Sequence, residues 1–514
     1  RAVGRAAGGR VSGGCRVTVA GGAAPGPRCG YRAEPRCYAV TNLTVTFNIA
    51  LDISRSRAED LRCTNRIPQS GGPPMTDPAN RAAERGLLDR IGLPKPLVLG
   101  YVGVLLFMIG DGVESGFIAP YMADHGAGTD VKAGYVITAY GVAVMLASWF
   151  SGALSQVWGP RKVMWVGLAI WAVFDALYLL FALGTENYPM MLILYGIRGF
   201  GYPLFAFGFL VWITGSAPKA RLGTAVGWFY FAFTGGLPTL GSLWSSFTIP
   251  AIGELGTLWT ALGLILVGGA IALVGAKRRE GGDRLADPGV TTGESLFNSV
   301  SIIWTHPRVL VGCLVRIINT APEFGMLVYL PRIFSDDVGF GTDKWLQLLA
   351  IIYGTNIFFN LIFGAVSDKI GWRTTIATFG ALGCAISVTV LYFVPTWLGP
   401  DYYWVAVLAG MLYGATLAGF VPISALIPNM APDNKGGAMA LLNLGAGGAA
   451  FVGPAVASLF LPLVGAGGVT IVFLVLYLIA MVLTFFLKMP EEQSGPGTPD
   501  PAAAPDKSSA PTPA

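Results

Sequence analysis

Apolar residues form a series of long stretches between residues 97 and 487, and short polar turns separate them. Each stretch is about 20 residues or longer, the length a helix needs to cross the hydrocarbon core of a bilayer. The pattern predicts an all-α membrane protein with twelve transmembrane helices. The predicted spans are 97–123, 131–157, 163–183, 188–215, 221–248, 254–275, 306–334, 345–367, 375–394, 402–428, 436–462 and 466–487.

The one long polar connector, residues 276–305, leaves six predicted spans on each side. The two sides repeat, because GALSQVWGPRK at 152–162 lies 212 residues before GAVSDKIGWRT at 364–374. A duplicated six-span unit is typical of secondary transporters, which bind substrate between the halves near the bilayer midplane. We therefore expect a six-helix bundle over 97–275, a cytoplasmic linker over 276–305 and a second six-helix bundle over 306–488.

Lys and Arg in the short loops predict the orientation in the membrane. One alternating set of loops is rich in basic residues and the other is mostly acidic, so the basic set is expected to be cytoplasmic. With an even number of spans, both termini are then cytoplasmic, and residues 75–96 form a cytoplasmic N-terminus. The expected location is the cell (inner or plasma) membrane. The basic set comprises Arg161, Lys162, Lys219, Arg221, Lys277, Arg278, Arg279, Lys369, Arg373 and Lys435.

Composition agrees with a membrane protein. Hydrophobic residues make up 53% of the chain and charged residues 12%, with a mean hydropathy of +0.60. Soluble domains carry about 25% charged residues, so a soluble enzyme is excluded, as is a secreted disulfide scaffold. No nucleotide-binding, metal-binding or nucleophile sequence pattern is found. We expect no catalytic residue, no cofactor, no metal and no nucleic-acid partner.

The two ends of the chain differ from its middle. Residues 1–74 contain eleven Arg, four acids and four of the six Cys, and the first Met is Met75. Three interpretations remain open for this segment: a translated stretch upstream of the true start, an Arg-rich transit peptide, or a disordered extension. The first is preferred. Residues 489–514 are rich in Pro, Ala and Ser, a composition that predicts disorder.

The repeated loop carries a family resemblance. Residues 95–488 resemble the major facilitator superfamily, whose signature follows spans 2 and 8, and the second copy matches it at Gly364, Asp368, Lys369 and Arg373. The first copy departs from the pattern, with Gln156 and Val157 where Asp and Arg are usual. The segments GDGVESGFIAPYM (110–122) and GIRGFGYPLFAFGFLVW (196–212) are similar to the polyol permease branch, which includes ribitol and D-arabinitol transporters. The resemblance implies the two-bundle fold of that superfamily and a gating role for the loop.

Two acids lie inside the first span. Asp111 and Glu114 are three residues apart and share one helix face. Charges at this depth cost about 2.5–3.5 kcal/mol on insertion scales, so they normally face a partner or an aqueous cavity. We interpret them as a proton site with a polyol hydroxyl acceptor, with a structural acid pair as the alternative. Arg198 in the fourth span is the expected partner of one of them, since spans 1 and 4 pack together in the family it resembles; Asp175 is expected to be structural.

The seventh span offers Arg316, Asn319 and Glu323 along one stripe. Glu323 lies 212 residues after Asp111, the same offset as the loop repeat, so each half is expected to place an acid at an equivalent depth. We assign Asp111, Glu114, Arg198 and Glu323 to proton coupling. The alternative is that Glu323 faces a neighbouring helix or the outer vestibule.

The remaining candidates are amides and aromatic rings. Amide side chains both donate and accept hydrogen bonds, which suits vicinal hydroxyls, and aromatic rings offer faces on which a sugar stacks. The alternatives are contacts that hold helices together, for the amides, and lipid or core packing, for the rings. The expected substrate residues are Arg316, Asn319, Asn356, Asn360, Asn443, Tyr202, Trp228, Tyr230 and Tyr353.

These residues predict a monomeric secondary carrier that imports a small neutral polyol or sugar alcohol by proton symport with alternating access. Its partners are the substrate, protons and the lipid bilayer. Two alternatives remain. A proton-coupled exporter of drugs or organic ions would have a cavity lined mainly by Phe and Met. A membrane sensor that has lost transport would not need an intact set of acids and Arg.

Overall fold

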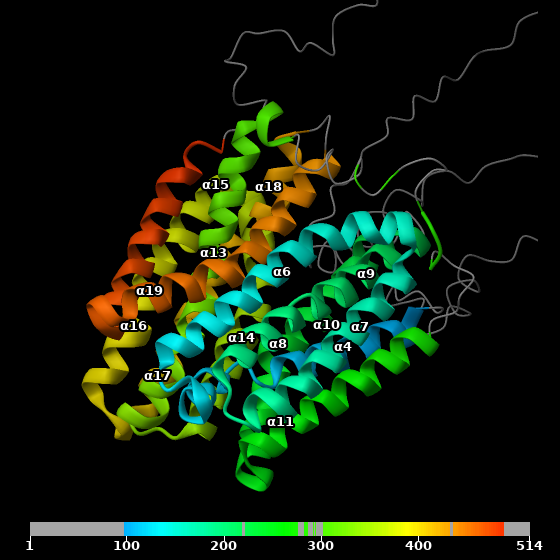
Figure 1. Cartoon of the computed structure of the whole chain (residues 1–514). Coiled ribbons are helices and arrows are strands. Elements are labelled where there is room, and N and C mark those ends of the chain that lie inside the picture. The colour runs from blue at the N-terminus through cyan, green and yellow to red at the C-terminus, as the bar shows by residue number, and fades with distance from the viewer. Residues whose placement is uncertain are drawn as a thin grey trace, which may run out of the picture. The chain divides into compact units, whose positions relative to one another are not determined.

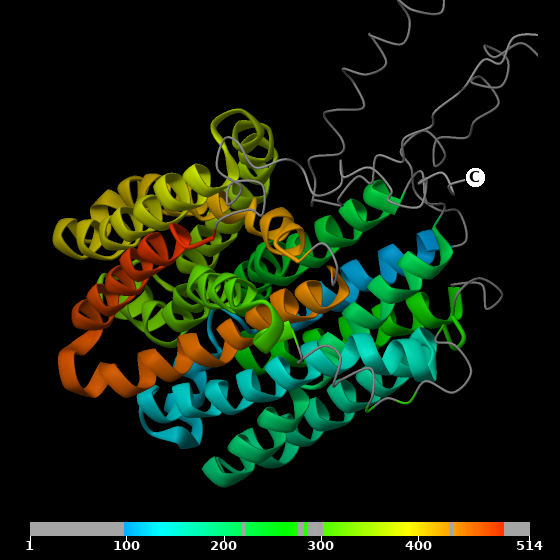
Figure 2. The same ribbon diagram turned by 90° about the horizontal axis from the view of Figure 1, so that it is seen from above.

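The computed structural model describes residues 97–217, 222–275, 282–285, 291, 293, 302–431 and 435–487, and all regular structure in these ranges is helical. Figures 1 and 2 show the described helices as one packed bundle seen from two directions. The expected segments 1–74, 75–96 and 489–514 lie outside the described residues, as does most of the linker.

The N-terminal half contains eight labelled helices. Short π-helical turns continue several of them, at Ala123–Ala127, Tyr178–Leu183 and Gly235–Leu240. The helices are α4 (Val98–Gly112), α5 (Ile118–Met122), α6 (Asp130–Trp158), α7 (Pro160–Leu177), α8 (Tyr188–Arg198), α9 (Gly201–Ser216), α10 (Leu222–Thr234) and α11 (Gly241–Gly275).

The C-terminal half contains seven labelled helices, again with short tighter or wider turns between some of them. These turns are Ile333–Asp337, Ile376–Leu382, Pro400–Tyr402 and Ala418–Phe420. The helices are α13 (Pro307–Arg332), α14 (Thr342–Ile370), α15 (Trp372–Thr375), α16 (Gly383–Leu398), α17 (Tyr403–Leu417), α18 (Ile423–Asn429) and α19 (Lys435–Thr484).

The predicted spans are confirmed. Among the described residues, nine helical stretches are long and apolar enough to cross a membrane. Two of these are 52 and 48 residues long, and each contains two successive spans that meet at a glycine with positive φ, Gly253 (74°) or Gly465 (68°). Only glycine adopts this conformation without strain. Together with the first span, formed by α4 and α5, the described helices give twelve.

Each half has its own apolar core, and the halves meet along α6 and α19, which run side by side in Figures 1 and 2. Small residues permit this contact. A Cβ atom at Gly141 would lie 2.1 Å from the carbonyl oxygen of Ala450, and one at Gly447 would lie 2.7 Å from the Ser148 hydroxyl. Close approach through small residues is the usual way helices pack in lipid.

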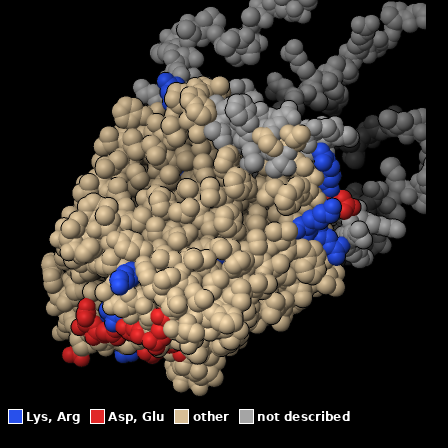
Figure 3. All heavy atoms as spheres, viewed as in Figure 1, with Lys and Arg blue, Asp and Glu red and all other residues tan. Residues whose placement is uncertain are grey.

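Charged side chains are concentrated at the two ends of the helices. Figure 3 shows the acidic side chains of this face gathered mainly at one end, together with a few basic ones, mostly basic side chains at the other end, and an almost uncharged belt between them. The belt matches a bilayer core, and large exposed side chains such as Val274 (75%) and Leu463 (72%) lie on spans that cross it. The protein is therefore a multi-pass membrane protein.

Candidate functional site

Arg198 binds two carboxylates inside the N-terminal half. Its Nη1 donates to Glu114 Oε2 over 2.9 Å and to Asp175 Oδ1 over 2.5 Å, and its Nη2 donates to Glu114 Oε1. The three side chains come from the first, third and fourth spans, and each residue is no more than 4% exposed. Charge-assisted and bidentate bonds of this kind are stronger than neutral ones, so the cluster holds the three spans together.

The two members of the ion pair lie where their spans are interrupted. Glu114 falls in the turn between α4 and α5, and Arg198 is the last residue of α8, three residues before α9 begins. Close packing accompanies the first interruption, because a Cβ at Gly112 would lie 1.5 Å from the carbonyl oxygen of Leu237 in the fifth span. Interrupted helices near the midplane are characteristic of transporter binding sites, where freed backbone groups and side chains face the ligand.

Asp111 lies one turn before Glu114 and has different partners. Its Oδ1 accepts from Trp171 Nε1 over 2.6 Å and from the Tyr140 hydroxyl over 3.4 Å. The structure therefore contains one of the two ion pairs that the sequence allowed, Arg198 with Glu114. Among the described residues, no contact below 4.0 Å joins Arg198 and Asp111.

Aromatic rings surround the guanidinium. Its central carbon lies 4.3 Å from the centroid of the Tyr195 ring and 4.7 Å from that of Trp171, and the Tyr195 hydroxyl also donates to Glu114 over 2.8 Å. Ring faces attract cations within about 6 Å. The rings stabilise the charge of Arg198 while they exclude water, which leaves the carboxylates as the groups that must balance it.

In the C-terminal half, α13 carries Arg316, Asn319 and Glu323 as the sequence predicts. Arg316 donates from Nη1 to Thr320 over 3.2 Å, and in the described part of the chain no carboxylate lies within 4.0 Å of it. Glu323 lies close to Tyr353 of α14, and Arg316 is near enough to act on its charge. Asn319 is buried, and its Oδ1 has no partner in the described structure.

The asparagines of α14 are bound to protein groups. Asn356 Nδ2 donates to the carbonyl oxygen of Gly414 over 3.2 Å, and Asn360 Nδ2 donates to Asn356 Oδ1 over 3.3 Å. This bonding joins the eighth and tenth spans, which is the helix-joining role that the sequence left open. A substrate hydroxyl would have to exchange with these bonds. Asn443 of α19 is half-buried.

The aromatic candidates divide between core and interface. Tyr202 is 8% exposed and packs against Tyr140 and Phe233, with ring centroids 6.5 Å and 6.2 Å away. Trp228 and Tyr230 are half-buried on α10. Tyr230 is close enough to Arg316 of the other half for their charges to interact, so these two residues approach each other across the boundary between the halves.

A set of ion pairs joins the halves at the acidic end of the bundle. Arg332, at the end of α13, donates from Nη2 to Asp124 over 2.7 Å and from Nε to Asp130 over 3.0 Å. Nearby, Trp345 Nε1 donates to the carbonyl oxygen of Gly116 over 2.7 Å. These bonds join residues more than 200 positions apart in sequence, so they close this end between the two halves.

Comparison with known proteins gives the family. The model of the Major Facilitator Superfamily matches residues 100–421, with a second match over 357–512. The chain belongs to the major facilitator superfamily. It is similar to an alpha-ketoglutarate permease of Bacillus subtilis (43% identical over 412 residues, 80% of this chain and 94% of that protein). It is also similar to the D-arabinitol transporter (38%, covering 79% and 95%) and the ribitol transporter (39%, covering 79% and 94%) of Klebsiella pneumoniae.

Solved structures of the superfamily share the fold. The structure of the proton:xylose symporter XylE aligns with a TM-score of 0.55 at 16% identity, covering 77% of this chain and 95% of that one. The family match confirms that the chain is a member of the superfamily, and the two Klebsiella relatives confirm the resemblance of the chain to polyol carriers. The chain is a membrane transporter of this superfamily, whose similar members are named as transporters and a permease.

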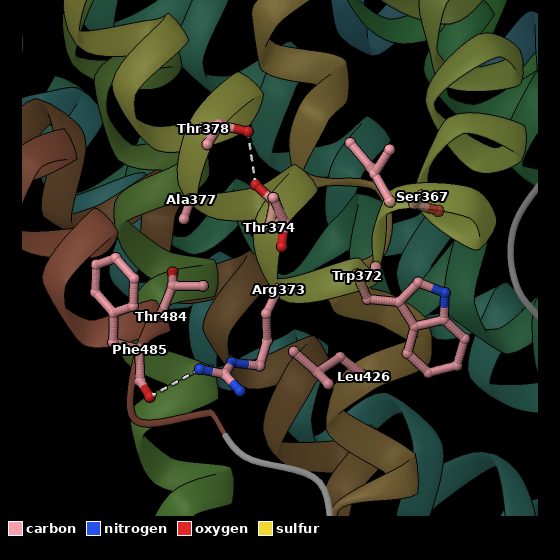
Figure 4. A pocket seen from close by; sticks show the side chains of 11 residues that line it. Ser367, Trp372, Arg373, Thr374, Ala377, Thr378, Leu426, Thr484 and Phe485 are labelled. Atoms are coloured by element: carbon pink, nitrogen blue, oxygen red, sulfur yellow. Dashed lines mark hydrogen bonds between the residues drawn. The ribbon is translucent and has the colours of Figure 1, made fainter. Parts of the chain in front are cut away.

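The superfamily loop after span 8 borders a pocket of about 650 Å³. Figure 4 shows Arg373 extended toward the backbone of Phe485, to whose carbonyl oxygen it donates over 3.4 Å. Gly364 is buried and Lys369 is exposed, while the side chain of Asp368 lies outside the described residues. Neither Arg316 nor Glu323 lines this pocket, so it is separate from the candidate site.

The loop after span 2, which lacks the usual acid, is bound by the linker instead. The backbone N–H of Leu285 donates to the carbonyl oxygen of Gln156 over 2.9 Å, and Arg161 N donates to that of Gly282 over 3.4 Å. Arg161 also donates from Nη2 to the carbonyl oxygen of Leu273 over 2.9 Å. Backbone hydrogen bonds thus hold this loop in place.

The sequence analysis did not name Trp171, a member of the N-terminal cluster, and it expected a structural role for Asp175 without identifying its partner. Both lie on α7 and are buried, at 3% and 0% exposure. They are four residues apart, which places them on one face of the helix. That spacing was the available signal, because a buried acid and an indole N–H on one face point to a shared polar partner.

Proposed function

We propose that this transporter imports a small neutral polyol by proton symport. The observation that carries the proposal is the buried group of Asp111, Glu114 and Arg198 at interrupted spans. A carboxyl group in such a place can bind a proton on one side of the membrane and release it on the other as the halves rock about the central site. The names of the ribitol and D-arabinitol transporters support the substrate class.

Alternating access also requires that contacts between the halves break and form. The Arg332 ion pairs and the Trp345 hydrogen bond close the acidic end, which we propose to be the outer side because the opposite end is basic. Both termini would then be cytoplasmic, with the carrier a monomer in the cell membrane. Protease protection of tags at each terminus, in sealed membrane vesicles of known orientation, tests this assignment.

Neutralising the first-span acids tests the coupling. Asp111→Asn keeps the shape of the side chain but cannot titrate, so it should abolish accumulation driven by a pH gradient while substrate counterflow continues. One coupled proton corresponds to about tenfold accumulation per pH unit. Glu114→Gln should impair substrate binding more than coupling, and Glu323→Gln tests the equivalent acid of the other half.

The measurement uses purified protein in proteoliposomes, with ribitol and D-arabinitol as substrates. Asp343→Asn, at the exposed start of α14, is the control and should behave as the wild type. If Asp111→Asn, Glu114→Gln and Glu323→Gln all still concentrate substrate in response to a pH gradient, coupling through intramembrane carboxylates is wrong.

A dicarboxylate is the second candidate substrate, and Arg316 is the observation that favours it. Its guanidinium is near enough to Tyr230 of the other half for their charges to interact, and no described carboxylate pairs with it within 4.0 Å. Guanidinium groups bind carboxylates bidentately, and one relative is named as an alpha-ketoglutarate permease. Competition of α-ketoglutarate with ribitol in the wild type and in Arg316→Gln distinguishes the two: only a carboxylate should lose most of its affinity in the variant.

The amides and carboxylates of the candidate site argue against the drug-exporter alternative, because a cavity for apolar drugs would be lined mainly by Phe and Met. An imposed pH gradient in the same proteoliposomes also tests this alternative. Export of an organic cation in exchange for protons, with no uptake of ribitol, D-arabinitol or α-ketoglutarate, would favour it.

A further inference from the structure

The buried cluster of the N-terminal half contains more acids than bases. Three carboxyl groups, those of Asp111, Glu114 and Asp175, lie around the single guanidinium of Arg198, and all four residues are at most 4% exposed. The remaining polar groups that face them are neutral. They are Tyr140 of α6, Trp171 of α7, Tyr178 of the following turn and Tyr195 of α8.

One guanidinium balances one carboxylate. Three ionised acids would leave two uncompensated charges in a site closed to water, and a single uncompensated buried charge already costs several kcal/mol. Two of the three acids therefore hold protons when the cluster is arranged as described. One acid is left as the ionised partner of Arg198.

The bonding makes Glu114 the main partner of Arg198. It accepts from both terminal nitrogens of Arg198 and from the Tyr195 hydroxyl, three donors in all, and bidentate pairing of this kind is the strongest between a guanidinium and a carboxyl group. Asp175 has one contact with the guanidinium, and its Oδ2 is buried with no partner in the described structure. Asp111 accepts only from neutral donors.

Asp175 nevertheless competes with Glu114 for the same nitrogen. Nη1 of Arg198 donates to both acids, over 2.9 Å to Glu114 and 2.5 Å to Asp175. A proton leaving Asp175 for water would create a second carboxylate beside this nitrogen. The guanidinium would then be shared, and its hold on Glu114, which lies in the interruption of the first span, would weaken.

We infer that Asp175 is a positioning residue for coupling, a proton-dependent competitor that governs how firmly Arg198 holds Glu114. The inference rests on the proposed proton symport. In the protonated state of Asp175, Arg198 fixes Glu114 and the first-span turn. In its ionised state, Glu114 is released toward the boundary between the halves. The proton moves between Asp175 and water when the site opens to water as the halves rock. Only the carboxyl O–H bond breaks or forms, while the hydrogen bonds of Arg198 to Glu114 weaken or strengthen in response.

The test compares Asp175→Asn, Asp175→Glu and the wild type in proteoliposomes, with counterflow and pH-driven accumulation measured separately. Asn cannot release a proton, so Arg198 should hold Glu114 at every pH. Counterflow should persist with a flattened pH profile, and accumulation should fall from about tenfold per pH unit to nearly none. Asp175→Glu can titrate and should restore the pH dependence.

Two further readouts separate this role from simple packing. Glu114→Gln removes the carboxylate with which Asp175 competes for Arg198, so adding Asp175→Asn to it should change the pH profile less than Asp175→Asn does alone. Infrared difference spectra should show a protonated carboxyl band that Asp175→Asn removes and Asp175→Glu shifts. If the Asn variant does not fold, the shift of the band between the wild type and Asp175→Glu still shows whether Asp175 carries the proton.

An unchanged pH profile and full accumulation in Asp175→Asn would overturn the inference, and Asp175 would then be a helix-joining residue. Absence of pH-driven accumulation in the wild type would instead refute the proposed symport. In that case the counterflow profile of Asp175→Asn still decides the competition: a profile identical to that of the wild type refutes it.

Discussion

Removing the charge of Arg332 should shift the protein toward a state that is open at the acidic end. Its two ion pairs with Asp124 and Asp130 join the halves, and opening that end must break both. The side chains of Arg332, Asp124 and Asp130 are 31%, 60% and 21% exposed, so solvent screens both ion pairs. Exposed pairs contribute about 0.2–1 kcal/mol each, and the more exposed Asp124 pair belongs at the low end of that range.

Together the pairs favour the closed end by about 1 kcal/mol, which corresponds to a roughly fivefold change in the ratio of closed to open molecules. Arg332→Gln should produce this shift, and high salt should reproduce part of it in the wild type, since salt screens exposed charges. Asp336→Asn is the matched control. It breaks a third pair of Arg332, at 3.7 Å, but both partners belong to the C-terminal half.

The assay measures distances between spin labels on the two halves, at Lys132→Cys and Lys344→Cys in a background without other cysteines. Both positions are exposed near the acidic end. Arg332→Gln should increase the population with long distances, and Asp336→Asn should not. An identical distance distribution in Arg332→Gln and the wild type, or an equal shift in the Asp336→Asn control, would refute the reasoning.

Two other predictions concern the packing and the amides. Gly141→Val should abolish transport and lower the thermal stability of the purified protein, because its side chain would collide with the backbone of α19; Gly152→Ala, where a Cβ meets nothing within 4 Å, should have little effect on either measurement. Asn360→Ala should raise the half-saturation concentration for substrate about threefold to tenfold, as expected for one neutral hydrogen bond, and unchanged affinity in transport assays would mean that this amide only joins helices.

The sequence predicted the spans well because a helix that crosses a bilayer needs about 20 mostly apolar residues in a row, and such stretches can be read directly from the sequence. It did not predict the interruption at Glu114, which is accompanied by the close approach of Gly112 to Leu237, more than a hundred residues away in the chain. Asp175 was assigned a structural role because the sequence offered no partner for it and the third span is peripheral in the fold that the chain resembles. Helix spacing shows which residues share a face but not which neighbour that face meets. For the same reason, the sequence could not decide whether Asp111 or Glu114 pairs with Arg198.

The pairing of Glu114 with Arg198 also constrains how the chain is made. The two residues are 84 positions apart, so at about 5–20 residues per second the ribosome needs roughly 4–17 seconds to reach the arginine. Throughout that interval the first span carries two acids with no guanidinium to balance them, at a cost of about 2.5–3.5 kcal/mol for each ionised acid at the bilayer centre. The newly synthesised first span must therefore keep its two acids protonated, or remain beside the insertion machinery, until the fourth span has been made. The ion pair of the N-terminal half is completed only by its fourth span, so a chain arrested before Arg198 is a poor substrate for release into lipid.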